Sequence, residues 1–199
     1  MYDGIQKSSI IFSEDSQRFA YVAQNFGQYR MVVDGKEVTA ADKVSNAVFS
    51  PDSKRVAFLI RKKDEDYIVL DGKESSYQNI FNLPIFSPDS KCIAFVVGNL
   101  KATPGAIPTA ASVVINSRKG KQYDIVLPQS VRFSPNGDHL VYVAMKNKKW
   151  FTVLDGKEGK PYEAILFGSK GIVFEDDETY RYIAVNGRNL VSVEEKIIE

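Results

Sequence analysis

The sequence of 199 residues contains one cysteine, one histidine and one tryptophan. A single cysteine excludes an internal disulfide. A cysteine nucleophile with a histidine base would have to use Cys92 and His139, and a zinc site would lack the several cysteine or histidine ligands that such sites use. No apolar stretch approaches the length of a transmembrane helix. We therefore expect no metal, no cofactor and no insertion into a membrane.

Charge of one sign is also missing, since 26 lysines and arginines face 25 acidic residues, for a net charge of +1. Such a balance gives no reason to expect nucleic acid as a partner. Residues 1–12 lack the basic start and apolar core of a signal peptide. The sequence thus predicts a cytoplasmic protein, or an exported one whose signal peptide has been removed. Its length suits a single domain, residues 1–199.

A five-residue phrase recurs along the chain, with Phe-Ser-Pro-Asp-Ser as its fullest form. Its first residue, called the key Phe below, is in turn Phe12, Phe49, Phe86, Phe133 and Phe174. The steps between these residues are 37, 37, 47 and 41. The rest of the chain, taken from both ends, again amounts to 37 residues. Repeats of about 40 residues made of short strands are typical of propeller blades. The spacing therefore predicts an all-β fold, a closed five-bladed β-propeller whose fifth repeat is completed by the N-terminus.

Each repeat is predicted to form a four-stranded antiparallel blade. A strand leads into the key Phe, and an apolar strand follows the turn, as in Arg55–Ile60. A third strand ends at Asp34-Gly35, Asp71-Gly72 or Asp155-Gly156, which favour a tight hairpin because primed turns need positive φ. The fourth strand is predicted to start at a tyrosine, with these ranges: Tyr77–Ile80, Tyr123–Val126 and Tyr162–Leu166.

The N-terminal segment Tyr2–Ile5 matches this fourth strand but stands apart from any repeat. We expect it to pair with Leu190–Val193 in the last blade, which would close the ring and cover an open edge.

These motifs give the chain a family resemblance. The Phe-Ser-Pro-Asp turn, the apolar strand after it and the Asp-Gly hairpin resemble the WD-repeat-like propeller repeats of TolB-like proteins, over essentially the whole chain. The resemblance implies a propeller that binds other proteins, or a propeller domain of a larger peptidase.

Two kinds of residue that could carry catalysis are interpreted as structural. Cys92 and His139 each lie six residues after a key Phe, in a column that also holds Arg18, Arg55 and Tyr180. Most carboxylates fall in the recurring turns, where they bond the local backbone. A glycosidase would need two facing carboxylates, but the positions four residues before each key Phe carry none. Those positions hold Ser8, Ser45, Asn82, Gln129 and Lys170.

The connections between second and third strands vary from repeat to repeat. They comprise Gln24–Gln28, Arg61–Asp66, Gly98–Ser112, Lys146–Lys149 and Asn186–Asn189. Variable loops carry function more often than stereotyped ones. These loops are basic, and the residues expected to bind a partner are Arg61, Lys62, Lys63, Lys101, Lys146, Lys148, Lys149 and Arg188.

The sequence leaves three functions open. The first is a non-enzymatic, monomeric platform that binds an anionic protein or peptide partner through the basic loops. The second is binding of a small ligand or carbohydrate at the channel mouth, through the polar positions four residues before each key Phe. The third is a propeller-type hydrolase.

Overall fold

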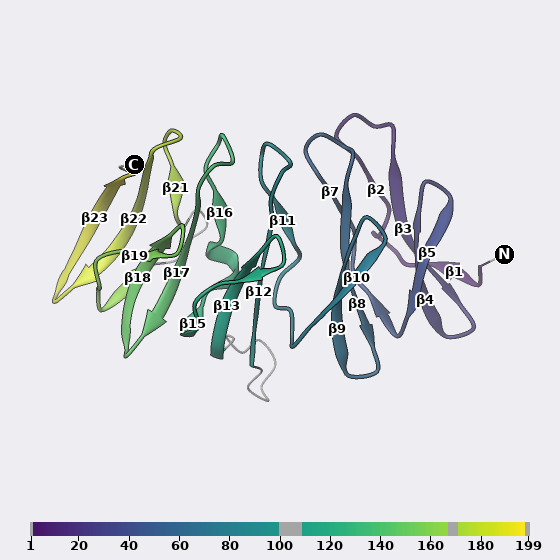
Figure 1. The fold of residues 1–199 in the computed structure, drawn as a ribbon, viewed down its shortest axis with the longest axis horizontal. Helices are drawn as coiled ribbons and strands as arrows, with labels where there is room; N and C mark the ends of the chain where they lie inside the picture. The colour runs from purple at the N-terminus through teal and green to yellow at the C-terminus, as the bar shows by residue number, and fades with distance from the viewer. Residues whose placement is uncertain (1, 100–108, 167–170, 198–199) are drawn as a thin grey trace. The chain divides into compact units, whose positions relative to one another are not determined.

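The computed structural model describes residues 2–99, 109–166 and 171–197 (Figure 1). The chain divides into two compact units, Met1–Ile93 and Ala94–Glu199, and each is described by itself. Apart from one short 3-10 turn at Pro128–Ser130, every described element is a β-strand, and all pairings are antiparallel. The predicted all-β class is confirmed.

The first repeat is a sheet whose innermost strand is split in two. β1 (Gly4–Ile5) and β2 (Ile11–Phe12) both pair with β3 (Phe19–Asn25), at its end and at its start. β4 (Gln28–Val33) and then β5 (Lys36–Ala41) complete the sheet. The break between β1 and β2 is bridged by Ser9.

The second repeat follows the same plan. Its strands are β6 (Lys43–Val44), β7 (Val48–Phe49), β8 (Val56–Lys62), β9 (Glu65–Leu70) and β10 (Lys73–Tyr77). β6 and β7 share β8 as β1 and β2 share β3. The third repeat begins with β11 (Ile85–Phe86).

In the second unit, two repeats share one continuous sheet. The strands are β12 (Ile93–Asn99), β13 (Thr109–Ile115), β14 (Arg118–Lys119), β15 (Tyr123–Val126), β16 (Arg132–Phe133), β17 (Leu140–Lys146), β18 (Lys149–Leu154) and β19 (Lys157–Glu158). β15 pairs with both β13 and β17, so it leaves one blade and enters the next.

The last repeat contains β20 (Ala164–Leu166), β21 (Val173–Phe174), β22 (Thr179–Asn186) and β23 (Asn189–Lys196). β20 and β21 are its split inner strand, and β22 and β23 form a long hairpin. Within the described ranges no strand pairs with the second edge of β23.

The predicted role of the N-terminal strand is wrong. Gly4 and Ile5 pair with Gln24 and Ala23 of the first repeat, not with Leu190–Val193. The pairing that was expected to close the ring is therefore absent. In the first, second, fourth and last repeats the inner strand is built from two short segments, and in the first repeat the N-terminal segment supplies one of them. The segments beginning at Tyr123 and near Tyr162 are likewise inner strands, because the outer strand directly follows the hairpin turn.

The Asp-Gly turns are confirmed as primed hairpins. Asp34, Asp71 and Asp155 have φ values of 51°, 52° and 48°, and the following glycines are also at positive φ. Each aspartate also accepts a hydrogen bond from the backbone N–H of the second strand, as Asp34 does from Phe19 at 3.0 Å. One side chain thereby fixes both the turn and the strand beside it.

The phrase after each key Phe forms a turn that also joins consecutive repeats. In the second repeat the Ser50 hydroxyl donates to Asp52 Oδ1 at 2.6 Å and accepts from Arg55 N–H at 2.9 Å. The last serine of the phrase accepts from the preceding repeat: Asp15 N–H donates to Ser53 Oγ at 3.1 Å. In the same way Asp52 N–H donates to Ser90 Oγ, at 2.9 Å.

Apolar side chains fill the space between consecutive sheets. In the first unit Val22 and Met31 of the first repeat belong to one buried cluster with Phe58 and Val69 of the second. This is sheet-on-sheet packing, and it buries the face of β8 that carries Val56, Phe58 and Ile60.

Candidate functional site

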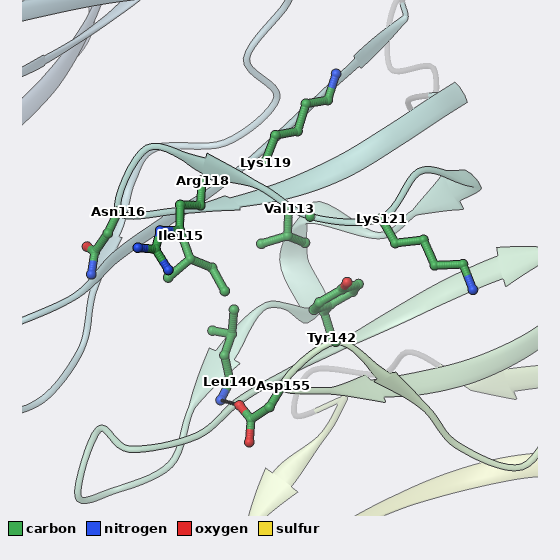
Figure 2. Close-up of a pocket in the computed structure, with 11 residues that line it drawn as sticks. Val113, Ile115, Asn116, Arg118, Lys119, Lys121, Leu140, Tyr142 and Asp155 are labelled. Atoms are coloured by element: carbon green, nitrogen blue, oxygen red, sulfur yellow. Dashed lines mark hydrogen bonds between the residues drawn. The ribbon is translucent and has the colours of Figure 1, made fainter.

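A cavity of about 560 Å³ lies between the third and fourth repeats, inside the second unit (Figure 2). Its walls come from β13 and β14 on one side and from β17 and the Asp155-Gly156 turn on the other. Val113 and Ile115 face Leu140 and Tyr142 across it. The cavity thus has an apolar floor of the size that holds one or two side chains of a ligand.

Cationic side chains surround this floor. Arg118, Lys119 and Lys121 line the cavity within four residues of one another. Lys121 is neutralised by an ion pair with Glu158, whose pKa it holds below the usual range. Arg118 and Lys119 have no ion pair among the residues that the structure describes. The rim therefore offers two positive charges to a ligand.

One tyrosine, Tyr142, lines the cavity, and a second, Tyr123, packs behind it. Tyr123 packs edge-on against Tyr142, with ring centroids 6.2 Å apart. Burial, and secondly the nearby Glu158 carboxylate, raise the pKa of Tyr123 to about 12. Its hydroxyl approaches Tyr142 and Glu158 but forms no hydrogen bond of acceptable geometry within the described chain. Both phenols have raised pKa values, so they stay protonated at neutral pH and do not act as bases.

The acidic residue of the cavity is occupied by its own fold. Asp155 Oδ1 accepts from Leu140 N–H at 2.9 Å, and Oδ2 lies 2.7 Å from His139 Nδ1. His139 repeats the contact that Arg18 makes with Asp34 and Arg55 makes with Asp71. The histidine is therefore a repeat-column residue with the same partner as its counterparts.

The column of residues after each key Phe differs from the prediction in the last repeat. Phe174 pairs with Tyr180, as Phe12 pairs with Phe19. Thr179, not Tyr180, therefore matches Arg18. The turn in the last repeat is one residue shorter. In the first repeat Ser13 N–H donates to the carbonyl of Arg18, five residues later, whereas in the last repeat Glu175 N–H donates to the carbonyl of Thr179, four residues later. Cys92 keeps the predicted position, and its N–H donates to Ser87 Oγ.

The predicted basic residues are not all available to a partner. Arg61 donates to Asp66 at 2.6 Å and Lys62 to Glu74 at 2.7 Å, which neutralises both. The backbone N–H of Lys63 donates to Asp42 Oδ2, which fixes the position of this residue in the turn. Lys146, Lys148, Lys149 and Arg188 lie in the second unit and form no ion pair among the described residues. Lys101 lies outside the described residues.

The predicted variable loops are mostly tight turns. Four of these connections have only two residues between the strands, for example Phe26-Gly27 between β3 and β4. The flanking strands are longer than predicted and leave little loop for recognition. The connection within Gly98–Ser112 falls largely outside the described residues.

The predicted polar ring is divided between structural and exposed positions. The Ser45 hydroxyl accepts from Leu59 N–H at 2.8 Å and so bridges the split inner strand of its repeat. Asn82 donates to Leu83 O. Ser8 and Gln129 are exposed, whereas the neighbouring Ser9 and Ser130 are buried and take the structural role of Ser45. Lys170 lies outside the described residues.

Sequence reasoning missed the cavity, although one signal was present. The third repeat has Asn116-Ser117 where three other repeats have Asp-Gly, followed by Arg118-Lys119.

Among the described residues no helix has the length and apolar character to span a membrane. The same part of the chain contains no group of three or more histidine, cysteine or acidic side chains suited to a metal ion.

No family model matches the sequence, and the search of curated proteins finds no significant match. Solved structures do resemble the chain. The β-propeller domain of the Trilobed protease from Pyrococcus furiosus aligns with a TM-score of 0.50 and 12% identity, over 98% of this chain and 71% of that one. The chain has a β-propeller fold.

Two further structures give similar results. Prolyl oligopeptidase B from Galerina marginata aligns with a TM-score of 0.54 and 15% identity, over 97% of this chain and 36% of that one. TolB from Acinetobacter baumannii aligns with a TM-score of 0.45 and 15% identity, over 98% and 52%. The chain spans about half the length of TolB and about a third of the peptidase.

These findings correct the predicted function. The structures that align with a TM-score of 0.50 or more are the propeller domain of a protease and a prolyl oligopeptidase, which contradicts the prediction of a stand-alone platform built on the basic loops. The contacts of Arg61 and Lys62 give a physical reason, since two of the expected recognition cations are already paired.

Proposed function

We propose that this chain is a propeller domain that holds peptide substrate for a peptidase-type protein. The cavity between the third and fourth repeats receives an apolar side chain, and Arg118 with Lys119 pairs with a carboxylate next to it in the peptide. Catalytic groups are supplied by a separate catalytic domain.

The observation that carries this proposal is the combination of an apolar floor with unpaired cations at one cavity. Val113, Ile115 and Leu140 can exclude water from an inserted side chain, and Arg118 can bind a carboxylate with two parallel hydrogen bonds. The likeness to peptidase propellers supports peptide as the ligand class. The prolyl oligopeptidase B structure is bound to a 35mer hydrolysis and macrocyclization substrate.

The test is binding of a fluorescein-labelled peptide with a Leu-Glu pair, followed by anisotropy with the full chain. We expect Arg118→Glu to weaken binding by about tenfold, because it replaces attraction of the carboxylate by repulsion. Arg188→Glu is the matched control, since it reverses an equally exposed cation in the turn between β22 and β23 and should change little. A peptide with Leu-Gln should also bind more weakly to the unaltered chain, but with a smaller loss than Arg118→Glu causes, because it removes the attraction without adding repulsion. Absence of binding, or equal losses in both variants, would refute the proposal.

A further inference from the structure

The cavity lies at a contact between repeats that recurs one repeat further along the second unit. Leu140 pairs with Phe133 as Tyr180 pairs with Phe174, so β17 and β22 can be compared position by position. Four pairs of positions correspond across the two contacts: Leu140 with Tyr180, Tyr142 with Tyr182, Val113 with Thr152, and Ile115 with Leu154. The contact between the fourth and last repeats therefore shows what this arrangement of strands holds when it is filled.

An aromatic ring fills the space at that second contact. Tyr180 is 1% exposed, and its ring centroid lies 6.2 Å from that of Tyr182. Its hydroxyl reaches across to Thr152 Oγ1 of the preceding repeat, at 3.4 Å. In the contact between the third and fourth repeats the smaller Leu140 stands at this position, with Val113 facing it (Figure 2). The cavity of about 560 Å³ thus lies where the neighbouring contact places a ring of its own sequence.

A carboxylate is also missing from the cavity by the same comparison. Tyr182 donates its hydroxyl proton to Glu195 Oε1 at 2.5 Å, whereas Tyr142, at the same position, donates to no carboxylate within the described chain. Asp155 matches Glu195 in register, but its two oxygens are engaged by the strand beside it and by His139. Burial raises the pKa of Tyr142, so this phenol keeps its proton and can donate it to an acceptor that enters the cavity.

Two equivalent glycines locate the place of that carboxylate. Gly159 donates its N–H to β18 and Gly120 donates to β13, at 2.8 and 2.9 Å. A Cβ built on Gly159 would lie 3.4 Å from Glu195 Oε1. A Cβ built on Gly120 would meet, apart from its chain neighbours, only the carbonyl oxygen of Val113 among the described residues. Gly120 lies among the cationic residues that line the cavity, so a carboxylate beside it would be attracted.

We propose that the ligand of this cavity presents an aromatic side chain and a carboxylate, which take the places that Tyr180 and Glu195 hold in the neighbouring contact. Tyr142 donates its hydroxyl proton to that carboxylate and thereby selects an acidic ligand. This inference rests on the proposed function, and it narrows the inserted side chain from any apolar group to an aromatic ring.

The test compares fluorescein-labelled peptides that contain Phe-Glu, Leu-Glu or Phe-Gln, by anisotropy with the full chain. Phe-Glu should bind about fivefold more tightly than Leu-Glu, because the ring fills more of the cavity with apolar surface. Tyr142→Phe should weaken binding of Phe-Glu by about tenfold and of Phe-Gln by less, because a hydrogen bond to a charged acceptor is the stronger one.

The peptide series separates this inference from the proposed function. Equal affinities for Phe-Glu and Leu-Glu, or equal losses for Phe-Glu and Phe-Gln in Tyr142→Phe, would overturn the inference. The proposed function would still stand in that case if Arg118→Glu weakened binding. No binding of any peptide would refute both.

A second variant tests the cavity itself. Leu140→Tyr places a tyrosine where the neighbouring contact has Tyr180, so the chain fills its own cavity and should lose at least about tenfold in affinity for Phe-Glu. Ile183→Tyr is the matched control, since it adds the same ring at a side chain of β22 that is 47% exposed, and it should leave the affinity unchanged. A circular dichroism spectrum checks that both variants fold, and Leu140→Phe provides the same test without a new hydroxyl if the tyrosine variant does not. Undiminished affinity in a folded Leu140 variant would place the peptide outside the cavity and overturn the proposal.

Discussion

The first and last repeats share one strand plan but differ in the groups that fill it. The first repeat is stabilised by the consensus turn network and keeps an apolar outer face. The last repeat has no Asp-Gly turn after β23, because β22 and β23 continue to pair beyond that point. Glu195 of β23 lies opposite Tyr180 as Asp34 lies opposite Phe19 in the first repeat. Glu195 accepts hydrogen bonds from the hydroxyls of Tyr180 and Tyr182 at 2.6 and 2.5 Å. The last repeat is thus held by hydrogen bonds from two buried tyrosines to Glu195 at the place where the first repeat uses its Asp-Gly turn.

This difference makes the last repeat sensitive to alkali. Burial, and secondly the hydrogen bond to Glu195, raise the pKa of Tyr180 and of Tyr182 above 10.0. Burial raises the pKa of Tyr142 as well. A phenol with a raised pKa in the folded state stabilises the fold below its unfolded pKa, and that contribution is lost as pH rises through the folded pKa.

We therefore expect the second unit to unfold first as the pH rises above 10, with a large loss of structure. Trp150, the only tryptophan, lies in β18 and reports on this unit by fluorescence, while far-ultraviolet circular dichroism reports on both units. Tyr142→Phe removes one ionisable group and should move the fluorescence transition to higher pH. The expectation would be contradicted if fluorescence and circular dichroism changed at the same pH, and if Tyr142→Phe did not shift that pH.

Removal of Glu195 should break the last repeat at neutral pH. Glu195→Ala leaves two buried tyrosine hydroxyls without their acceptor and should lower the free energy of unfolding by about 2–4 kcal/mol. The matched control is Glu194→Ala, one residue earlier and on the exposed side of the strand, which should cost less than about 1 kcal/mol. Urea denaturation measures both values. Equal losses would show that the tyrosine contacts add nothing.

The repeat was readable from sequence because each consensus residue has a local physical role. Positive φ at Asp34 and the hydrogen bonds of Ser50 and Asp52 follow from residue type and spacing alone. Pairing of short strands did not follow, since two-residue segments such as Gly4–Ile5 carry no periodicity that selects a partner. The one-residue contraction before Thr179 also escaped, because no residue in Glu175–Glu178 marks it.

The candidate site was harder to predict than the fold for a different reason. The cavity brings Ile115 together with Leu140 and Tyr142, which belong to a different repeat. Each of these residues individually fits an ordinary strand position. Only the packing of β13 and β14 against β17 leaves space between them. The basic loops, by contrast, were visible in the sequence, but the partners of Arg61 and Lys62 lie at sequence separations of 5 and 12 and were not recognised.

The smallest expected effect tests what the serine contact between the first and second repeats contributes to stability. Ser16 and Ser53 occupy the same turn position, with φ of 59° and 62°, so replacement by alanine imposes the same backbone cost on both. Ser53 is buried and accepts from Asp15 N–H, whereas Ser16 is exposed. Ser53→Ala should therefore lower the free energy of unfolding by about 1 kcal/mol and leave the Asp15 N–H unpaired. Ser16→Ala should change it by less than about 0.5 kcal/mol. Urea denaturation measures both. Equal losses in the two variants would show that the hydrogen bond from Asp15 N–H to the Ser53 hydroxyl adds nothing to stability.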